Sequence, residues 1–526
     1  MKTSAKKRTM RALGLAAILI LGLFATAQAK VDGLYNGANP TFNLTAATGY
    51  IVGGDGAVLH IWGLSPQGGP VQYPAPTLII PQGSTVTVNL TNQLAEPVSL
   101  VFPGQTNVQA TGGIEGLVTR EAVPGGTVTY TFTAATPGTF MYQSGSNMAL
   151  QIEMGLAGAI IVRPAGFAIP GNMTAYGTAD TAYDQEILYF QSEMDHRIHE
   201  KVDSGQASLV DLTTWFPYYW FYNGRNAPDV FSAAGVPWLP NQPYDCFPHL
   251  LPGQKMLLRI VGAGRDMHPF HHHGNSATLI AVDGQVLEST PGSNNPDLGE
   301  VLFTQPVLPG QTRDVIFSWN GNELGFDIYG HVATDPILEV EVFAAATLQD
   351  PLAETDTEVN VAAPSQGAFP KRRAFRAVLT SGLATDPARE VVVLRMDDPA
   401  QPNILTVVKR GQEGTTTPAS WSANTSAVIG TYHGQIFAGP ADNRFPVTLP
   451  DQKDLTMGAF YSGSPFLGAM GTLPPGEGGF NLNNGLAFMW HSHSEKELTN
   501  NNIFPGGAIS IAIVEPFGTT IEQSAH

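Results

Sequence analysis

The sequence predicts an all-β protein with three β-sandwich domains. Only 13% of the 526 residues are charged, and the chain contains 57 glycines and 40 prolines, a composition typical of many strands joined by tight turns. A unit made of a Pro/Gly turn followed by a strand-like stretch also recurs. Its copies begin at Pro81, Pro124, Pro252 and Pro309, with a looser copy at Pro474.

The stretches after these turns have the two-residue period of a strand with one buried face. After the turn at Pro81, the apolar residues Val86, Val88 and Leu90 alternate with polar ones, and Met256–Ile260 repeats the pattern after the turn at Pro252. Pairs of such copies predict repeated sandwiches rather than one large sheet.

Residues 1–29 are predicted to be a secretory signal peptide. Five basic residues precede the apolar run Ala12–Ala25, and the small-x-small sequence Ala27-Gln28-Ala29 follows as a cleavage site. The run of 14 residues is too short to span a bilayer, and no later stretch is apolar enough to do so. We therefore expect an exported protein, periplasmic or extracellular, with no membrane span.

Two segments of irregular composition divide the remaining chain. Residues 164–182 are rich in Pro, Gly, Ala and Thr, and residues 346–369 carry Asp, Glu, Pro and Ser with little periodicity. Both are interpreted as linkers. The predicted domains are therefore 30–163, 183–345 and 370–518.

Charge and cysteine content exclude some partners and some means of stabilisation. The leader carries five basic and no acidic residues, so the mature chain keeps 21 basic against 44 acidic residues and a net charge of about −23. Such a chain repels nucleic acid and anionic membranes but tolerates cationic ligands. Cys246 is the single cysteine, so no intrachain disulfide forms, and it is interpreted as a small core residue.

The densest functional signal is the stretch 267–274, Met-His-Pro-Phe-His-His-His-Gly. In an extended chain His271 and His273 point to one face and His268 to the other. Imidazole is a preferred ligand of copper, zinc, iron and nickel, so this density beside a strand-like run favours a metal site. The alternative is a histidine-rich surface loop.

A second histidine pair, His491 and His493, has Ser492 between them. The other histidines are scattered. His60, His196, His199 and His249 are isolated and are interpreted as ordinary hydrogen-bonded residues, whereas His433 is left open as a ligand.

Several stretches of the sequence resemble a known family, the multicopper oxidases. The stretches 74–92 and 155–162 are similar to the start and the end of that family's first domain. His268–Gly274 resembles its H-P-x-H-x-H-G motif, and 488–493 resembles its H-x-H motifs. The resemblance covers nearly the whole mature chain and implies three cupredoxin-like Greek-key β-sandwich domains.

The resemblance also implies two kinds of copper site. Family members hold one copper with two histidines, a cysteine and a weak axial ligand, and they reduce oxygen at a cluster of eight histidines supplied as H-x-H pairs. In this chain the matching first-domain positions read Val101–Gly104 and Tyr142–Gly145, without histidine. Tyr329-Gly330-His331 keeps one histidine and has glycine where the family has cysteine.

The predicted metal site therefore contains histidines only. His271, His273, His331, His491 and His493 would form a copper cluster between domains 2 and 3, and His268 matches a ligand of the single copper. Zinc is an alternative metal.

Three functions follow from these residues. The first is a copper oxidoreductase that oxidises a small reductant or a metal ion, with dioxygen as the acceptor. The second is a copper- or zinc-binding protein without turnover, and the third is a structural protein on a degenerate scaffold. Loss of the cysteine argues against the first in its ordinary form, and survival of paired histidines argues against the third. The substrate, the catalytic residues and the oligomeric state stay open.

Overall fold

The computed structural model describes most of the chain. It covers residues 28–251, 253–319, 342–371, 374–381, 389–412, 415, 417–431, 486–515 and 519–526. Of the predicted signal peptide, residues 1–27 lie outside this range, as do His331 and His433.

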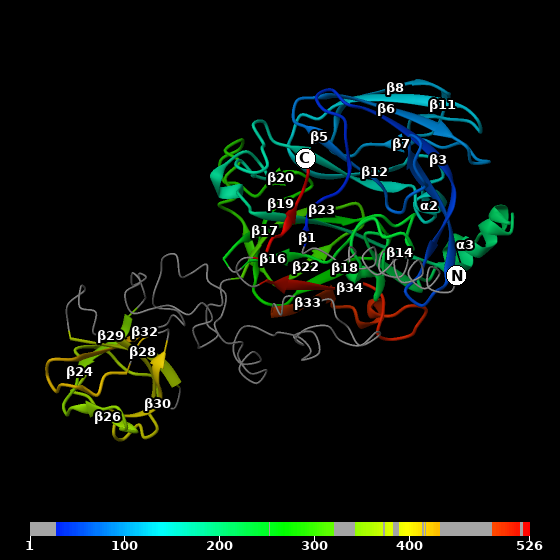
Figure 1. The fold of residues 1–526 in the computed structure, drawn as a ribbon. Coiled ribbons are helices and arrows are strands. Elements are labelled where there is room, and N and C mark those ends of the chain that lie inside the picture. Colours follow the sequence, from blue (N-terminus) through cyan, green and yellow to red (C-terminus); the bar gives the residue numbers. More distant parts are fainter. Residues whose placement is uncertain are drawn as a thin grey trace, which may run out of the picture.

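The first domain is a sandwich of two five-stranded sheets, drawn in blue and cyan in Figure 1. One sheet contains, in spatial order, β4 (Val58–Pro66), β3 (Thr41–Val52), β6 (Thr85–Asn92), β11 (Thr127–Thr133) and β8 (Thr106–Gly112). The other contains β2 (Leu34–Tyr35), β5 (Ala75–Pro81), β13 (Ala157–Arg163), β12 (Gly138–Ser144) and β7 (Leu100–Val101). The alternation predicted for 85–92 appears in β6, where Val86, Val88 and Leu90 are buried in the core.

A second sandwich follows, and its two sheets come from distant parts of the chain. The larger sheet contains β15 (Tyr219–Tyr222), β14 (Gln185–Met194), β17 (Lys255–Gly262), β23 (Thr312–Ser318), β19 (Ala277–Val282) and β20 (Gln285–Val286), with β21 (Glu300–Leu302) beside β19. The smaller sheet contains β16 (His249–Leu250), β34 (Ile509–Val514), β33 (Leu486–Ser492), β18 (His268–His272) and β22 (Thr304–Val307).

The third β unit is formed by residues 342–431 and has its own hydrophobic core. Its seven-stranded sheet contains β26 (Glu358–Asn360), β30 (Ile404–Gln412), β29 (Arg389–Arg395), β28 (Ala374–Thr380), β32 (Ala427–Thr431), β24 (Val342–Thr347) and β27 (Gln366–Gly367). A strand pair, β25 (Leu352–Ala353) and β31 (Ser420–Trp421), accompanies it.

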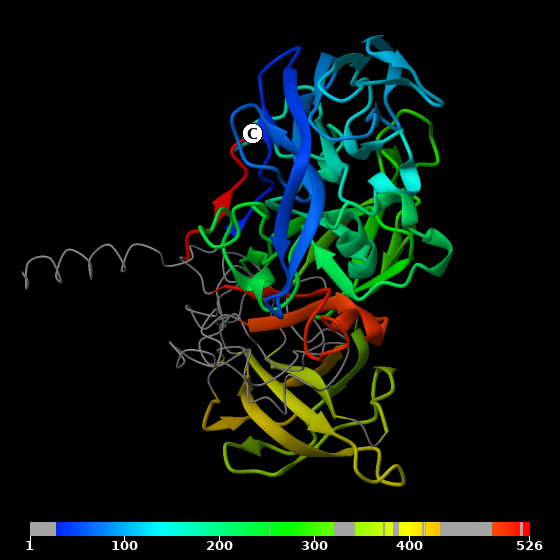
Figure 2. The ribbon, with the colours of Figure 1, turned by 90° about the vertical axis from the view of Figure 1, so that its right-hand side faces the viewer.

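The structure groups the strands differently from the expected third domain, 370–518. Strands β33 and β34 do not join the sheet of residues 342–431; they pair with β18 and β16 in the second sandwich, as Figures 1 and 2 show in orange and red. The expected linker 346–369 also carries strands of the third unit. Period-two patterns show that a segment is a strand but not which strand it pairs with, so the grouping was not readable from the sequence.

The remaining elements are short. Two further strand pairs are β1 (Gln28–Ala29) with β35 (Glu522–Gln523) and β9 (Ile114–Glu115) with β10 (Arg120–Glu121). The helices and single turns are α2 (Met148–Gln151), α3 (His196–Asp203), η1 (Ala179–Thr181), η2 (Ala207–Leu209), η3 (Leu212–Thr214), η4 (Asp229–Phe231) and η6 (Glu495–Leu498). The all-β prediction is confirmed. In the part of the chain that the structure describes, no helix is long and apolar enough to cross a membrane.

The first two sandwiches pack face to face through an apolar layer and a buried charge network. Met141 and Ile161 of the first sandwich meet Phe190 and Val261 of the second in one cluster. This contact explains why β17 is buried on both faces, whereas the sequence pattern predicted one.

Within this interface Glu186 of β14 lies between two arginines. Its carboxylate accepts hydrogen bonds at 2.7 Å from Arg163 of β13 and at 2.8 Å from Arg259 of β17. Burial alone would raise the pKa of Glu186, but the two guanidinium groups outweigh it and hold that pKa well below its usual range.

We predict that Glu186→Gln lowers the free energy of unfolding by about 3–5 kcal/mol, because it removes the carboxylate that two buried guanidinium groups share and leaves Arg259 with only the carboxylate of Asp314, at 3.8 Å, among the described residues. The lowered pKa means that this stabilisation is present above the ordinary glutamate pKa and is lost as the pH falls below it. Urea denaturation at several pH values measures both effects. Asp397→Asn removes the carboxylate of the exposed Arg395–Asp397 pair and is the control that should leave stability unchanged. A Glu186→Gln protein as stable as the wild type at neutral pH would contradict the prediction.

Candidate metal centre

The histidine pairs lie at the ends of two neighbouring strands of one sheet, with His273 directly after β18 and His493 directly after β33. Strand β18 pairs antiparallel with β33, and in this register His271 lies directly opposite His491. Phe270 and Trp490 point from the same strands into the core of the sandwich. The alternation of strand side chains therefore places apolar residues on the inner face and the paired imidazoles on the outer face.

Four imidazoles converge on the outer face. The ligand nitrogens of His271, His273 and His491 all lie within 4.8 Å of one another. The Nε2 atoms of His273 and His491 are 3.3 Å apart. Two nitrogens that each lie about 2.0 Å from one tetrahedral metal ion are separated by roughly 3.3 Å. The ring of His493 lies 4.7 Å from that of His271, centroid to centroid.

Burial keeps three of these imidazoles, those of His271, His273 and His491, neutral. It lowers the pKa of His271 to about 4 and that of His273 to about 3, and the neighbouring imidazoles lower both further. The pKa of His491 is also lowered, again mainly by burial. At neutral pH the rings therefore carry lone pairs, which metal binding requires.

Two hydrogen bonds orient the rings. The Nδ1 of His491 donates to the carbonyl oxygen of Ser492 at 2.7 Å, which leaves its Nε2 as the lone-pair nitrogen facing His273. The Nδ1 of His271 lies 2.7 Å from the hydroxyl of Thr304 on the adjacent strand β22. Partners of this kind fix the tautomer and the direction of ligand histidines. Thr304 was not found from the sequence, because only the β18–β22 pairing brings it beside His271.

The structure corrects the expected location of the site. The sequence placed the two pairs on opposite sides of a boundary between domains 2 and 3, but they lie side by side within one sheet of the second sandwich. His331, which completed the predicted set, lies outside the described residues, as does His433.

His268 is not part of this group. It lies on the inner face of β18, as its parity predicted, but both of its ring nitrogens are already engaged. Nε2 lies 2.8 Å from Glu193 and Nδ1 lies 2.8 Å from Glu497. Burial opposes its charge, but the two carboxylates prevail and raise the pKa of His268 to about 10. A protonated ring has no lone pair for a metal, so the expectation that His268 is a ligand does not fit this arrangement.

Cys246 and two of the isolated histidines, His199 and His249, have the structural environments that the sequence predicted, whereas the buried Nδ1 atoms of His60 and His196 have no hydrogen-bond partner among the described residues. Cys246 is buried in the core, and its thiol lies 3.6 Å from the carbonyl oxygen of Tyr222. Burial raises its pKa, which disfavours the thiolate that a metal would need. His199 is hydrogen-bonded at 2.6 Å to the backbone of His60, and His249 is paired at 2.6 Å with Glu515.

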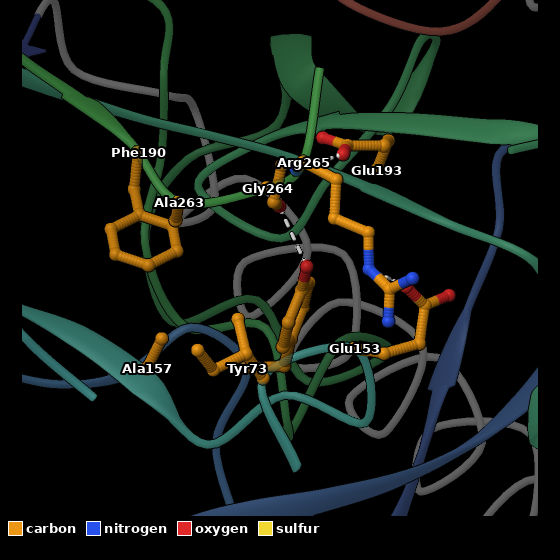
Figure 3. Close-up of a pocket in the computed structure, with 10 residues that line it drawn as sticks. Tyr73, Glu153, Ala157, Phe190, Glu193, Ala263, Gly264 and Arg265 are labelled. Atoms are coloured by element: carbon orange, nitrogen blue, oxygen red, sulfur yellow. Dashed lines mark hydrogen bonds and ion pairs between the residues drawn. The ribbon is translucent and has the colours of Figure 1, made fainter. Parts of the chain in front are cut away.

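A small cavity lies between the first two sandwiches. Tyr73 and Glu153 line it from the first sandwich, and Glu193 and Arg265 line it from the second (Figure 3). Its volume of about 10 Å³ suits a single water molecule rather than an organic substrate. It is therefore not a substrate pocket.

The known proteins that are similar to this chain include copper enzymes. Residues 70–166 match the family model described as multicopper oxidase. The chain is 31% identical over 166 residues to L-ascorbate oxidase of Cucurbita pepo var. melopepo, which covers 31% of this chain and 28% of the relative. It is 34% identical over 217 residues to the iron transport multicopper oxidase fetC of Epichloe festucae, covering 40% of this chain and 30% of the relative.

Other matches are shorter or more distant. Laccase 1 of Metarhizium robertsii is 35% identical over 97 residues, which is 18% of this chain and 16% of the relative. Among solved structures, the blue copper oxidase of Nitrosomonas europaea aligns with a TM-score of 0.40 and 22% identity, over 54% of this chain and 77% of that chain. Each of the three sequence alignments spans less than a third of the relative's own length. Residues 70–166 therefore match a multicopper oxidase domain, and the chain is similar to curated multicopper oxidases over part of its length.

Proposed function

We propose that the protein is an exported copper-binding oxidoreductase that oxidises a small reductant or a metal ion, with dioxygen as the electron acceptor. The observation that carries this proposal is the convergence of His271, His273, His491 and His493 as neighbouring imidazoles on one sheet face. His331 remains a proposed fifth ligand. The names of the relatives, which include oxidases of ascorbate and an iron transport oxidase, support the type of reaction.

The donor set fits copper. Neutral imidazoles bind both copper and zinc, and the 3.3 Å nitrogen separation suits either. The family relatives favour copper, which when bound supplies one-electron redox chemistry that zinc lacks. The chain's own part is to hold the rings of His271 and His491 through Thr304 and the Ser492 carbonyl and to keep both unprotonated by burial.

A small reductant or a metal ion has a route to this group. His493 is exposed, and His271 and His273 are half-buried. Phe303 is 61% exposed and its ring lies 5.7 Å from that of His271, so an apolar surface borders the imidazoles. The net charge of about −23 of the mature chain, which follows from its acidic excess, also attracts cations.

The alternative is a copper- or zinc-binding protein without turnover. The ionised His268 and the buried Cys246 favour it, because neither offers the ligands of a separate electron-accepting copper. Oxygen consumption by the copper-loaded mature protein, with hydroquinone or ferrous ion as the reductant, separates the two functions. Consumption lost in His271→Ala/His273→Ala supports the oxidoreductase, whereas tight copper binding without oxygen consumption favours the alternative.

We predict that His271→Ala/His273→Ala and His491→Ala/His493→Ala each abolish copper binding and the rise in Tm that copper causes. Metal bound across two strands stabilises the folded state by about 2.7 kcal/mol when its concentration is a hundred times Kd. The quadruple variant should lose no more than either double variant, because one site is removed in each. Metal analysis and thermal melts with and without copper measure this.

His196→Ala serves as the control, since it removes a histidine of helix α3 that lies outside the group. Its copper content and copper-dependent Tm shift should equal those of the wild type. Additive losses in the quadruple variant would indicate two separate sites and contradict a shared one.

We predict that copper-loaded protein shows no intense blue absorption. That colour needs a thiolate–copper bond, whereas Ser492 stands between the two ligand histidines and the thiol of Cys246 is buried among backbone carbonyls. Visible spectra of the wild type and Cys246→Ser should be the same. A strong band that Cys246→Ser removes would contradict this prediction.

A further inference from the structure

The inner face of β18 carries a buried ionic group directly behind the histidine pairs. His268 is 3% exposed, and its two carboxylate partners, Glu193 and Glu497, are also buried. The three residues come from three segments that are far apart in sequence: β14, β18 and the turn η6.

Each of the two glutamates is held by hydrogen bonds that involve backbone groups. Glu193 accepts backbone N–H groups from Arg265 and Asp266, which lie in the turn that leads into β18. Glu497 lies in η6, which follows β33 after two residues, and its backbone hydrogen bonds with Ser494 and Ala508 keep that turn beside the start of β34. His268 therefore connects the strand of His271 to the segment that continues from His491 and His493.

We propose that Glu193, His268 and Glu497 form a metal-free ionic clamp that positions the paired histidines by holding β18 in place beside β33 and against β14. This inference rests on the proposed copper function, because the clamp acts through the geometry of that histidine group.

The physical basis is the cost of misplacing buried charges. A buried imidazolium with two carboxylates is stable only while both short hydrogen bonds are kept, so small shifts of β18 against η6 are resisted. Copper ligation needs nitrogen positions accurate to a few tenths of an ångström, and the Nε2 atoms of His273 and His491 already stand 3.3 Å apart. A clamp on the opposite face of the same two strands preserves that separation.

The surrounding charges support an ionised group rather than a metal site. Asp266 and Lys496 interact electrostatically with the group that Glu193 and Glu497 form around His268. Tyr222 of β15 also interacts with the carboxylate of Glu497. Both ring nitrogens of His268 are hydrogen-bonded to the two carboxylates. A metal ion that bound to His268 would therefore have to displace a proton and break one of these hydrogen bonds. Ser492, which lies on the same inner face, offers a hydroxyl and no thiolate.

The chain offers a matched control. His249 of β16 also forms a buried pair with a carboxylate, that of Glu515. Strand β16 belongs to the same sheet but lies at the edge opposite β22. His268→Gln and His249→Gln therefore each remove one buried imidazole from the same sandwich. Only the first should disturb the strands of the histidine pairs.

The experiment compares copper affinity and amide hydrogen exchange in the wild type and both variants. We expect His268→Gln to weaken copper binding about 10–100-fold, the usual cost of losing an outer positioning partner of a metal site. It should also speed exchange of the amides in the β18–β33 pairing of the metal-free protein. His249→Gln should lower Tm by a similar amount and leave both readouts unchanged. Glu497→Gln, which keeps the shape and removes one charge, should be intermediate and serves if His268→Gln does not fold.

The pH profile is a third readout. Because the carboxylates raise the pKa of His268 to about 10, its stabilisation is fully present below the ordinary histidine pKa and is lost as the pH rises through 10. The difference in unfolding free energy between wild type and His268→Gln should therefore shrink at high pH.

The outcomes separate the clamp from the proposed function. Unchanged copper affinity with unchanged exchange in the His268→Gln protein would overturn the clamp. Equal effects of both variants would also overturn it, since the role would then be general stability. If the wild type binds no copper, the proposed function fails, and the exchange data alone decide: faster exchange confined to β18–β33 supports the clamp, and uniform exchange overturns it.

Discussion

The pairing of β18 with β33 is the constraint on which the candidate centre depends. These strands are more than 200 residues apart in sequence, yet they are neighbours with His271 opposite His491. Directly opposite residues on one sheet face have side chains close enough to touch. A shift of the register by one residue would turn one pair into the core and expose Phe270 or Trp490 in its place. The apolar inner face thus stabilises the same register that brings the imidazoles together.

The stretch 268–273 carries histidines in two opposite protonation states. On the outer face, burial among other imidazoles lowers the pKa values of His271 and His273 and keeps both neutral. On the inner face, two carboxylates raise the pKa of His268 and keep it charged. Residue type is the same in both cases, so the difference comes from the charges that the fold places within hydrogen-bonding distance. The neutral rings suit a metal cation, and the charged ring suits a structural ion pair.

The structure shows what this chain has where its sequence departs from the multicopper oxidase pattern. The first domain keeps the sandwich but has no histidines at the positions of the family's pairs, and it packs against the second through Glu186 and its two arginines. The second sandwich contains both remaining pairs. On the inner face of these strands, Ser492, an ionised His268 and the buried carboxylate of Glu497 form a group without a free metal ligand.

Much of this protein could be predicted from its sequence, because the relevant signals are local. The two-residue period identified strands such as β6, the parity of 268–273 assigned His268 and His271 to opposite faces, and the spacing of His491 and His493 marked them as a pair. Strand periodicity and H-x-H spacing depend only on neighbours in the chain. The resemblance of 268–274 to a family motif was equally local.

Only the tertiary structure decided which strands pair and which charges meet. It moved β33 and β34 from the expected third domain into the second sandwich, and it brought Thr304 to His271. It also placed Glu193 and Glu497, which are 304 residues apart, on the two nitrogens of His268. Strand partners and pKa values depend on contacts between segments that are distant in sequence, and the hydrophobic pattern of one strand is compatible with many partners. The sequence therefore determined the strands and the candidate ligands, whereas the long-range pairing of the strands decided which histidines lie close together.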